Sequence, residues 1–212
     1  MAKYLTRTER CAVCGRESEQ RVLLSRYVAD RELDRKPLGD VVSFALECPH
    51  CRYAANDLEE PVSAAKRAYV LCEDYQAWTR RQEDAMLRRL EGAAKIAEHL
   101  EQWAEAADCW LSAAWYCEEH GMEARAEENR ALAVQMVETV PGLHLTPEQL
   151  LSYIDSLRRL GHFARAEQLS RQMEDGFVRA LGEHALLTKL LRREITLAQG
   201  GDRAAHRVSE VE

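Results

Sequence analysis

From residue 61 onward, apolar side chains recur at steps of three and four residues, which is the pattern of amphipathic helices. The first such stripe consists of Ala65, Ala68, Tyr69, Cys72, Tyr75 and Trp78. Prolines at the first turn and a Thr146 N-cap before Pro147 mark two helix starts. We therefore expect helices near residues 62–80, 82–100, 103–120, 122–139, 147–160, 162–175 and 179–198.

This helical part contains an internal repeat. The stretch "GMEARAEEN" begins at Gly121 and "GHFARAEQL" begins at Gly161, and a similar stretch starts at Glu101. Repeats of helix, short turn and helix at this spacing indicate a helical array. The order Gly161, Phe163, Ala166 resembles the turn and second helix of a tetratricopeptide repeat. We expect an antiparallel, tetratricopeptide-like array over residues 61–200 and a flexible tail over 201–212.

The first 60 residues have a different pattern. Residues 21–25 ("RVLLS") and 41–47 ("VVSFALE") favour β-strands, the second because apolar residues alternate along it. The charged stretch between them contains Pro37 and Gly39 and suits a loop. We expect a small β domain over residues 1–60, so the fold class is mainly α with a small N-terminal β part.

Two Cys-x-x-Cys pairs flank these predicted strands. Cys11 and Cys14 form the first pair, and Cys48 and Cys51 form the second. One such turn directs two thiolates at one ion, and two turns complete a tetrahedral zinc site. The sequence therefore predicts a zinc ribbon over residues 1–60 that holds one structural Zn2+ per chain. Since four cysteines leave no open position on the metal, we do not expect catalysis there.

Other interpretations of these cysteines remain open. A redox pair would need a βαβ pattern and a lowered thiol pKa, and no such pattern is visible. His50 lies inside the second pair and offers a replacement ligand. Gly15 suits the sharp turn after Cys14, whereas Arg52 occupies the equivalent place after Cys51. We expect the other three cysteines, and most of Trp103, Trp110, Trp115 and Tyr116, to be core residues.

Charge and composition limit the functional classes. The 212 residues carry a net charge of −7, which disfavours non-specific binding to nucleic acid. The cysteine count of seven is odd, so a disulfide framework is not expected. We see neither a signal peptide nor an apolar run of about 20 residues, so we expect a cytoplasmic location without membrane contact. No phosphate loop or nucleophile motif is present, and we do not expect an enzyme.

With both cysteine pairs and the helices in view, the chain resembles a bacterial family known only as domain-of-unknown-function family 2225. The resemblance is carried by "CAVCG", by "CPHCRYAA" from Cys48 to Ala55, and by "AWYCEEHG" over residues 114–121. Arg52 departs from the glycine that is usual in that family. The resemblance implies metal binding by Cys11, Cys14, Cys48 and Cys51 and tetratricopeptide-like helices, and it implies no reaction.

Three hypotheses about function follow. The first is a non-catalytic adaptor or scaffold, with a structural zinc ribbon and a helical surface that binds another protein or a second copy of the chain. In this hypothesis the loop over residues 26–40 is displayed as a contact. The second is a nucleic-acid-associated regulator that uses the ribbon, and the third is a thiol or zinc redox sensor.

Overall fold

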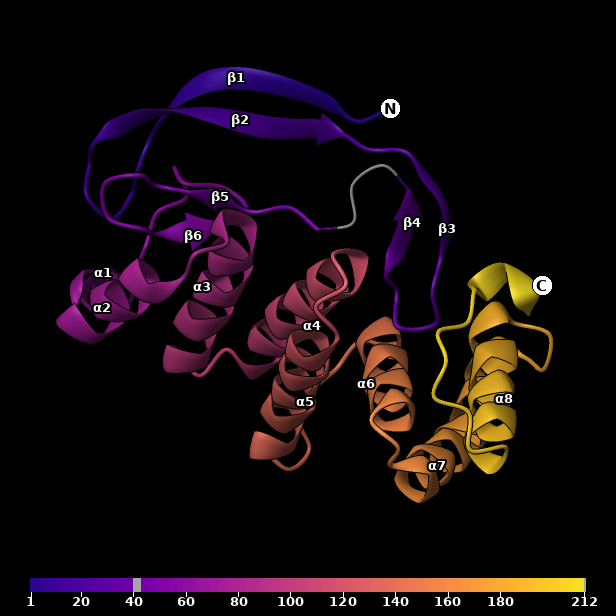
Figure 1. The fold of residues 1–212 in the computed structure, drawn as a ribbon. Coiled ribbons are helices and arrows are strands. Elements are labelled where there is room, and N and C mark those ends of the chain that lie inside the picture. Colours follow the sequence, from indigo (N-terminus) through magenta and orange to yellow (C-terminus); the bar gives the residue numbers. More distant parts are fainter. Residues whose placement is uncertain (40–42, 212) are drawn as a thin grey trace. The chain divides into compact units, whose positions relative to one another are not determined.

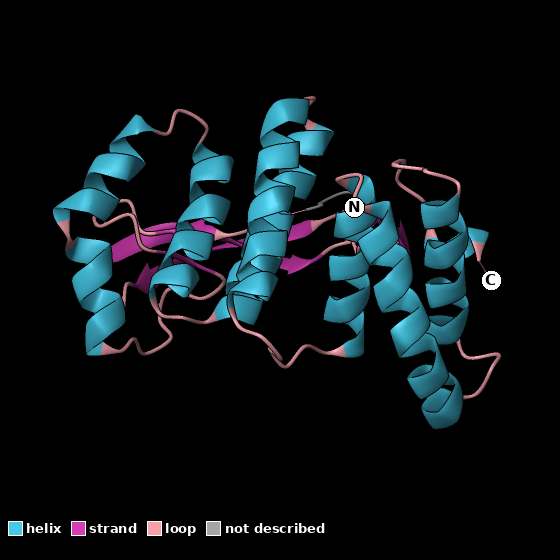
Figure 2. Cartoon of the chain, turned by 90° about the horizontal axis from the view of Figure 1, so that it is seen from below, coloured by secondary structure: helices cyan, strands magenta, loops and turns pink. Residues whose placement is uncertain are grey.

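Helices make up most of the chain and the strands form short antiparallel pairs (Figures 1 and 2). The computed structural model describes residues 1–39 and 43–211. Its strands are β1 (Lys3–Arg10), β2 (Glu17–Ser25), β3 (Val28–Arg31), β4 (Pro37–Gly39), β5 (Leu46–Glu47) and β6 (Ala54–Ala55). Its helices are α1 (Ala64–Leu71), α2 (Glu73–Arg81), α3 (Ala85–His99), α4 (Trp103–Glu119), α5 (Glu123–Thr139), α6 (Pro147–Arg159), α7 (Phe163–Leu181), α8 (Leu186–Gln199) and the 3-10 helix η1 (Val208–Glu210). The expectation of a mainly α chain with a small N-terminal β part is confirmed.

The chain forms two compact units. Unit 1 consists of Met1–Tyr27 and Asp40–Val140, and unit 2 consists of Val28–Gly39 and Pro141–Glu212. Unit 1 thus contains both cysteine pairs together with α1 to α5, and unit 2 contains the β3–β4 hairpin with α6 to α8. The expected division of the chain into domains over residues 1–60 and 61–200 stays a prediction.

The helical core of unit 1 is built from small and aromatic side chains. Ala94 and Ala97 on α3 pack with Trp110 on α4 and with Ala133 and Met136 on α5. Trp110 and Trp115 are at most 9% exposed, and Trp103 packs against the same cluster. These tryptophans therefore fill space between helices, as the sequence led us to expect.

One type of turn recurs at the helix ends of both units. In each case a residue with positive φ follows the helix, the next amide donates to a carbonyl five residues earlier, and the pattern is that of a Schellman motif. The residues with positive φ are Glu101, Gly121, Gly161 and Gly201. After the first three of these turns, the alanine five residues on is buried in every case: Ala106, Ala126 and Ala166. The repeat seen in the sequence is thus a repeat of turn geometry and of close helix packing.

The first predicted helix, over 62–80, is wrong in one respect, because it is two helices. Cys72 has an extended backbone, with φ −70° and ψ 154°, which ends α1 and begins α2. The Gln76 side-chain amide donates to the carbonyl oxygen of Val70 at 2.7 Å and so binds a helix-end carbonyl. Farther along the chain, α7 ends at Leu181 and α8 begins at Leu186, later than the boundaries that we expected at 175 and 179.

The strand predictions are partly wrong. Residues 21–25 do lie in β2, but β2 pairs with β1, a strand that the sequence analysis missed. Of the predicted strand 41–47, residues 41 and 42 lie outside the described part of the chain, and only Leu46–Glu47 form a strand, paired with Ala54–Ala55. Strand pairing depends on contacts between distant segments, which alternation within one segment does not specify.

The segment expected as a displayed loop is instead a hairpin packed within unit 2. Strands β3 and β4 are antiparallel, and Leu33 and Asp34 between them are at most 5% exposed. The Ser152 hydroxyl on α6 donates to the Asp34 carbonyl oxygen at 2.9 Å, and Arg159 forms an ion pair with the Asp34 carboxylate at 3.2 Å. Residues 28–39 therefore form a packed hairpin and not the extended loop that we expected, and their use as a contact stays a prediction.

The segment expected as a flexible tail has defined contacts in unit 2. The Arg158 guanidinium donates to the carbonyl oxygens of Asp202 and Ala204 at 2.6 and 2.9 Å. The Leu33 amide donates to the His206 carbonyl oxygen at 3.0 Å, and η1 lies beside β3. These bonds connect the C-terminal segment to the β3–β4 hairpin and to α6.

Candidate metal centre

Four cysteine thiols from two distant segments meet in unit 1. The sulfur atoms of Cys11 and Cys51 are 3.6 Å apart, those of Cys14 and Cys48 are 3.7 Å apart, and all four lie within 4.8 Å of one another. A disulfide would bring two of them to about 2.0 Å, so these are free thiols. The structure thus joins the two Cys-x-x-Cys pairs into one cluster.

The spacing of the sulfur atoms fits a tetrahedral metal ion. A zinc ion with Zn–S bonds of about 2.3 Å places its sulfur ligands about 3.8 Å apart. The two closest sulfur pairs match this distance, and the widest separation requires an adjustment of about 1 Å. Soft thiolate ligands in this geometry are those that zinc prefers.

The first pair lies in a tight turn that follows β1. The Gly15 amide donates to the Cys11 carbonyl oxygen at 2.8 Å, and the Cys11 amide donates to the Arg16 carbonyl oxygen at 3.0 Å. Gly15 has a φ of 71°, which glycine adopts without the steric cost that a Cβ atom brings. The turn therefore directs the thiols of Cys11 and Cys14 to the same side.

The second pair repeats this geometry without a glycine. The Arg52 amide donates to the Cys48 carbonyl oxygen at 2.9 Å, and the Cys48 amide donates to the Tyr53 carbonyl oxygen at 2.9 Å. Arg52 has a φ of 61°, so it occupies the left-handed region in place of the expected glycine. Such a conformation costs an L-residue about 1–2 kcal/mol, which neighbouring contacts must offset.

Side chains on α1 and α2 donate hydrogen bonds to backbone carbonyl oxygens of the two cysteine turns. Arg67 on α1 donates to Val13 and Ala12 at 2.6 and 2.8 Å. On α2, the Gln76 side-chain amide donates to the Cys51 carbonyl oxygen at 2.8 Å. The break at Cys72 separates α1, which holds the first turn, from α2, which holds the second. No sequence motif marks Arg67 and Gln76 as supporting residues, so they could not be predicted from the sequence.

Glu47 connects the second turn to helix α3. Its carboxylate, 3% exposed, accepts from Arg52 at 3.0 Å and from Arg88 at 2.9 Å, and Arg89 lies 3.7 Å away. A buried carboxylate needs such partners, because burial removes the water that would otherwise solvate its negative charge. The two cysteine turns are therefore fixed to α3 as well as to α1 and α2.

The cysteines are part of the hydrophobic core. Cys11, Cys48 and Cys51 are at most 4% exposed and pack with Leu58 and Ile96, among others. Burial raises the pKa of Cys11 to about 11 and also raises that of Cys51. Burial opposes the Cys14 thiolate too, but hydrogen bonds from the Arg16 amide and from Cys48 outweigh it and lower that pKa. A bound divalent cation would supply the charge that buried thiolates need.

The remaining candidate ligands lie elsewhere. The His50 ring nitrogen Nε2 is 3.3 Å from the Glu17 carbonyl oxygen, the residue is exposed, and it is not one of the side chains that meet in the cluster. Cys117 is buried, whereas Cys72 and Cys109 are half-buried. Within residues 1–39 and 43–211, no other group of three or more histidine, cysteine or acidic side chains has the spacing of a metal site.

Comparisons of this chain with protein-family models, curated proteins and solved structures found no similar protein. The resemblance to domain-of-unknown-function family 2225 stays a prediction. In the part of the chain that the structure describes, none of the helices has the length and apolar character needed to cross a membrane.

Proposed function

We propose that this protein is a non-catalytic adaptor or scaffold. Cys11, Cys14, Cys48 and Cys51 hold one structural Zn2+, and the helical surface binds another protein or a second copy of the chain. The observation that carries the zinc part is the meeting of the four thiols at tetrahedral spacing inside a core shared with α1, α2 and α3. We place the protein in the cytoplasm, where thiols stay reduced.

A structural role for zinc is supported by the closed site. Catalytic zinc sites hold three protein ligands and leave one position for water or substrate, whereas four thiolates leave none. Three of the four cysteines are also nearly inaccessible to solvent. The zinc would hold together the two cysteine turns, to which side chains on α1 and α2 donate hydrogen bonds. Its binding energy would contribute to the folding of unit 1.

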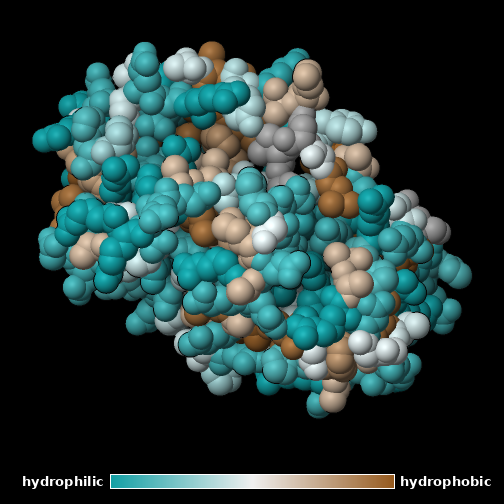
Figure 3. Space-filling model, viewed as in Figure 1, coloured by the Kyte–Doolittle hydropathy of each residue, from teal (hydrophilic) through white to brown (hydrophobic). Residues whose placement is uncertain are grey.

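The adaptor part is supported by the repeated helix–turn–helix arrangement. Repeats of this kind present extended surfaces that bind other proteins. On the face drawn in Figure 3, hydrophilic residues predominate and hydrophobic residues are scattered. A partner that binds this face would form mainly polar contacts.

Elemental analysis tests the zinc part. Protein purified without added metal should contain one zinc per chain, and Cys11→Ser with Cys48→Ser should remove it. The matched control is Cys72→Ser with Cys109→Ser, which changes two half-buried cysteines outside the cluster and should keep the metal. Wild-type protein without metal, or full zinc content in the first double variant, would contradict the proposal.

Assembly from purified components tests the adaptor part. The expected result is a complex of fixed stoichiometry, either with a purified partner or between two copies of the chain, seen by analytical ultracentrifugation. A chain that stays monomeric over the accessible concentration range, and for which no purified candidate assembles, would contradict the adaptor proposal and leave the zinc proposal untouched.

A second candidate function is a thiol sensor, and the exposure of one cysteine favours it. Cys14 is half-buried, whereas the other three thiols of the cluster are buried. Oxidation would then begin at Cys14 and release the metal. Peroxide should release zinc in parallel with modification of Cys14, and a reductant should restore binding; a site that keeps its zinc under peroxide would exclude this function.

A further inference from the structure

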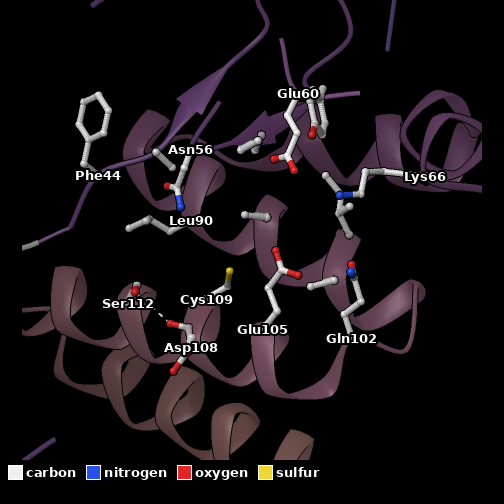
Figure 4. A pocket seen from close by; sticks show the side chains of 17 residues that line it. Phe44, Asn56, Glu60, Lys66, Leu90, Gln102, Glu105, Asp108, Cys109 and Ser112 are labelled. Carbon is white, nitrogen blue, oxygen red and sulfur yellow. Dashed lines mark hydrogen bonds between the residues drawn. The ribbon is translucent and has the colours of Figure 1, made fainter. Parts of the chain in front are cut away.

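Unit 1 also contains a cavity, which is lined by acidic and other polar side chains that are not part of the metal centre. It has a volume of about 320 Å³ and lies between the ribbon segment around β5 and β6 and the helices α3 and α4 (Figure 4). This volume is at the lower end of the range for small-ligand sites. Part of its wall is apolar and includes Phe44, Leu90 and Ile96.

The polar part of the wall is mainly acidic. Glu60 and Glu105 enter the cavity from opposite sides, and neither carboxylate has an ion-pair or hydrogen-bond partner among the described residues (Figure 4). Asp108 adds a third acid, and Lys66 is the one basic residue among the described residues that line the cavity. The lining therefore has a net charge of −2, which favours a cationic group.

Tyr53 provides an independent indication of a ligand. Its side chain lines the cavity and is only 2% exposed, yet its hydroxyl has no hydrogen-bond partner within the described part of the chain. The hydroxyl can therefore accept a hydrogen bond from a donor on a ligand in the cavity.

We propose that this cavity binds a primary ammonium group carried on an aliphatic stem. An ammonium has three N–H donors, and Glu60, Glu105 and the Tyr53 hydroxyl offer three oxygen acceptors. The stem would lie against Phe44, Leu90 and Ile96. This site does not include the four cysteines, although Tyr53 follows the second cysteine pair and so requires that this turn is folded.

The experiment is a calorimetric titration of the zinc-loaded protein with 1-aminopentane. The expected result is saturable binding, with 1-pentanol, its neutral counterpart, at least about tenfold weaker. Lysine blocked at both backbone ends is a further probe. Tighter binding of this probe would identify a lysine side chain of a protein as the source of the ammonium, and tighter binding of 1-aminopentane would identify a free amine.

Variants test the assigned acceptors. Glu105→Gln, at an exposed helix position, and Tyr53→Phe should each weaken amine binding about tenfold, and Lys66→Met should strengthen it. Glu123→Gln removes the same charge from exposed α5 surface outside the cavity and should leave binding unchanged. Equal binding of amine and alcohol, or wild-type affinity in Glu105→Gln, would overturn the proposal. Because zinc content is measured in every sample, a wild-type protein that holds its full zinc content but does not bind the amine rejects this site and not the metal centre.

Discussion

The Tyr75 hydroxyl on α2 donates a 2.8 Å hydrogen bond to the carbonyl oxygen of Arg52. Arg52 is the residue that closes the second cysteine turn with a positive φ, and Tyr75 is only 2% exposed. The bond is therefore shielded from water, and it holds a conformation that an arginine adopts at a cost. Through this bond the helical part of unit 1 acts on the geometry of the metal centre.

Tyr75→Phe should weaken both the fold and the metal centre. The change removes this hydrogen bond from the Arg52 carbonyl oxygen, which should lower the free energy of unfolding by about 1–2 kcal/mol. Zinc should also transfer faster to a chelator, because the second turn loses a support. Denaturant unfolding and chelator kinetics measure the two effects.

Tyr116→Phe is the matched control for this prediction. The Tyr116 hydroxyl donates to the Asp84 carboxylate at 3.1 Å, between α4 and the start of α3, and forms no hydrogen bond with either cysteine turn. Its zinc transfer rate should equal that of the wild type. If Tyr75→Phe also releases zinc at the wild-type rate, α2 does not support the metal centre.

Glu101→Gly should stabilise unit 1. Glu101 has a φ of 57° at a turn whose three counterparts all carry glycine, and its exposed side chain has no partner among the described residues. Glycine removes the cost of the left-handed conformation, so the free energy of unfolding should rise by about 1 kcal/mol. Glu98→Gly, three residues earlier within α3, should instead lower it by about 0.5–1 kcal/mol. Thermal unfolding that shows the same sign for both variants would contradict this interpretation of the turn.

Glu194→Gln should change how the stability of unit 2 depends on pH. Burial, followed by the nearby charge of Asp155, raises the pKa of Glu194 well above its usual range, despite the opposing effect of Arg158. The folded state therefore holds this proton more tightly than the unfolded state. Its contribution to stability is complete below about pH 4.3 and is lost as the pH rises through the folded-state pKa.

The variant keeps a neutral side chain at every pH, so its stability relative to the wild type should increase from about pH 5 to about pH 8. The expected change is at least about 1 kcal/mol, measured by urea unfolding at several pH values. Glu183→Gln, at an exposed position, is the control and should show no such trend. A difference between Glu194→Gln and wild type that is constant with pH would contradict the prediction.

The parts of the fold that local sequence determines were predictable. Apolar periodicity located most helices of the array, and the glycines of the repeat marked its turns. The cysteine spacing identified the four residues that cluster, because a Cys-x-x-Cys turn needs only local geometry to direct two thiols together.

The parts that depend on distant contacts were not predictable. The break at Cys72 lies within a continuous apolar stripe and is accompanied by a bond from Gln76 to Cys51, 25 residues away. The sequence of residues 28–39 is typical of a charged loop, but the segment is a hairpin in which Asp34 and Lys36 are buried. Their ion-pair partners, Arg159 and Glu32, belong to unit 2. Burial of charged residues depends on partners that hydrophobic patterning does not reveal.

X-ray absorption at the zinc edge tests the central claim most directly. Protein purified without added metal should show four sulfur neighbours at about 2.3 Å and no nitrogen or oxygen in the first coordination sphere. A spectrum that requires one or more nitrogen or oxygen neighbours at about 2.0–2.1 Å would contradict the closed four-thiolate site. Such a spectrum would indicate either that His50 is a ligand or that the metal has an open position.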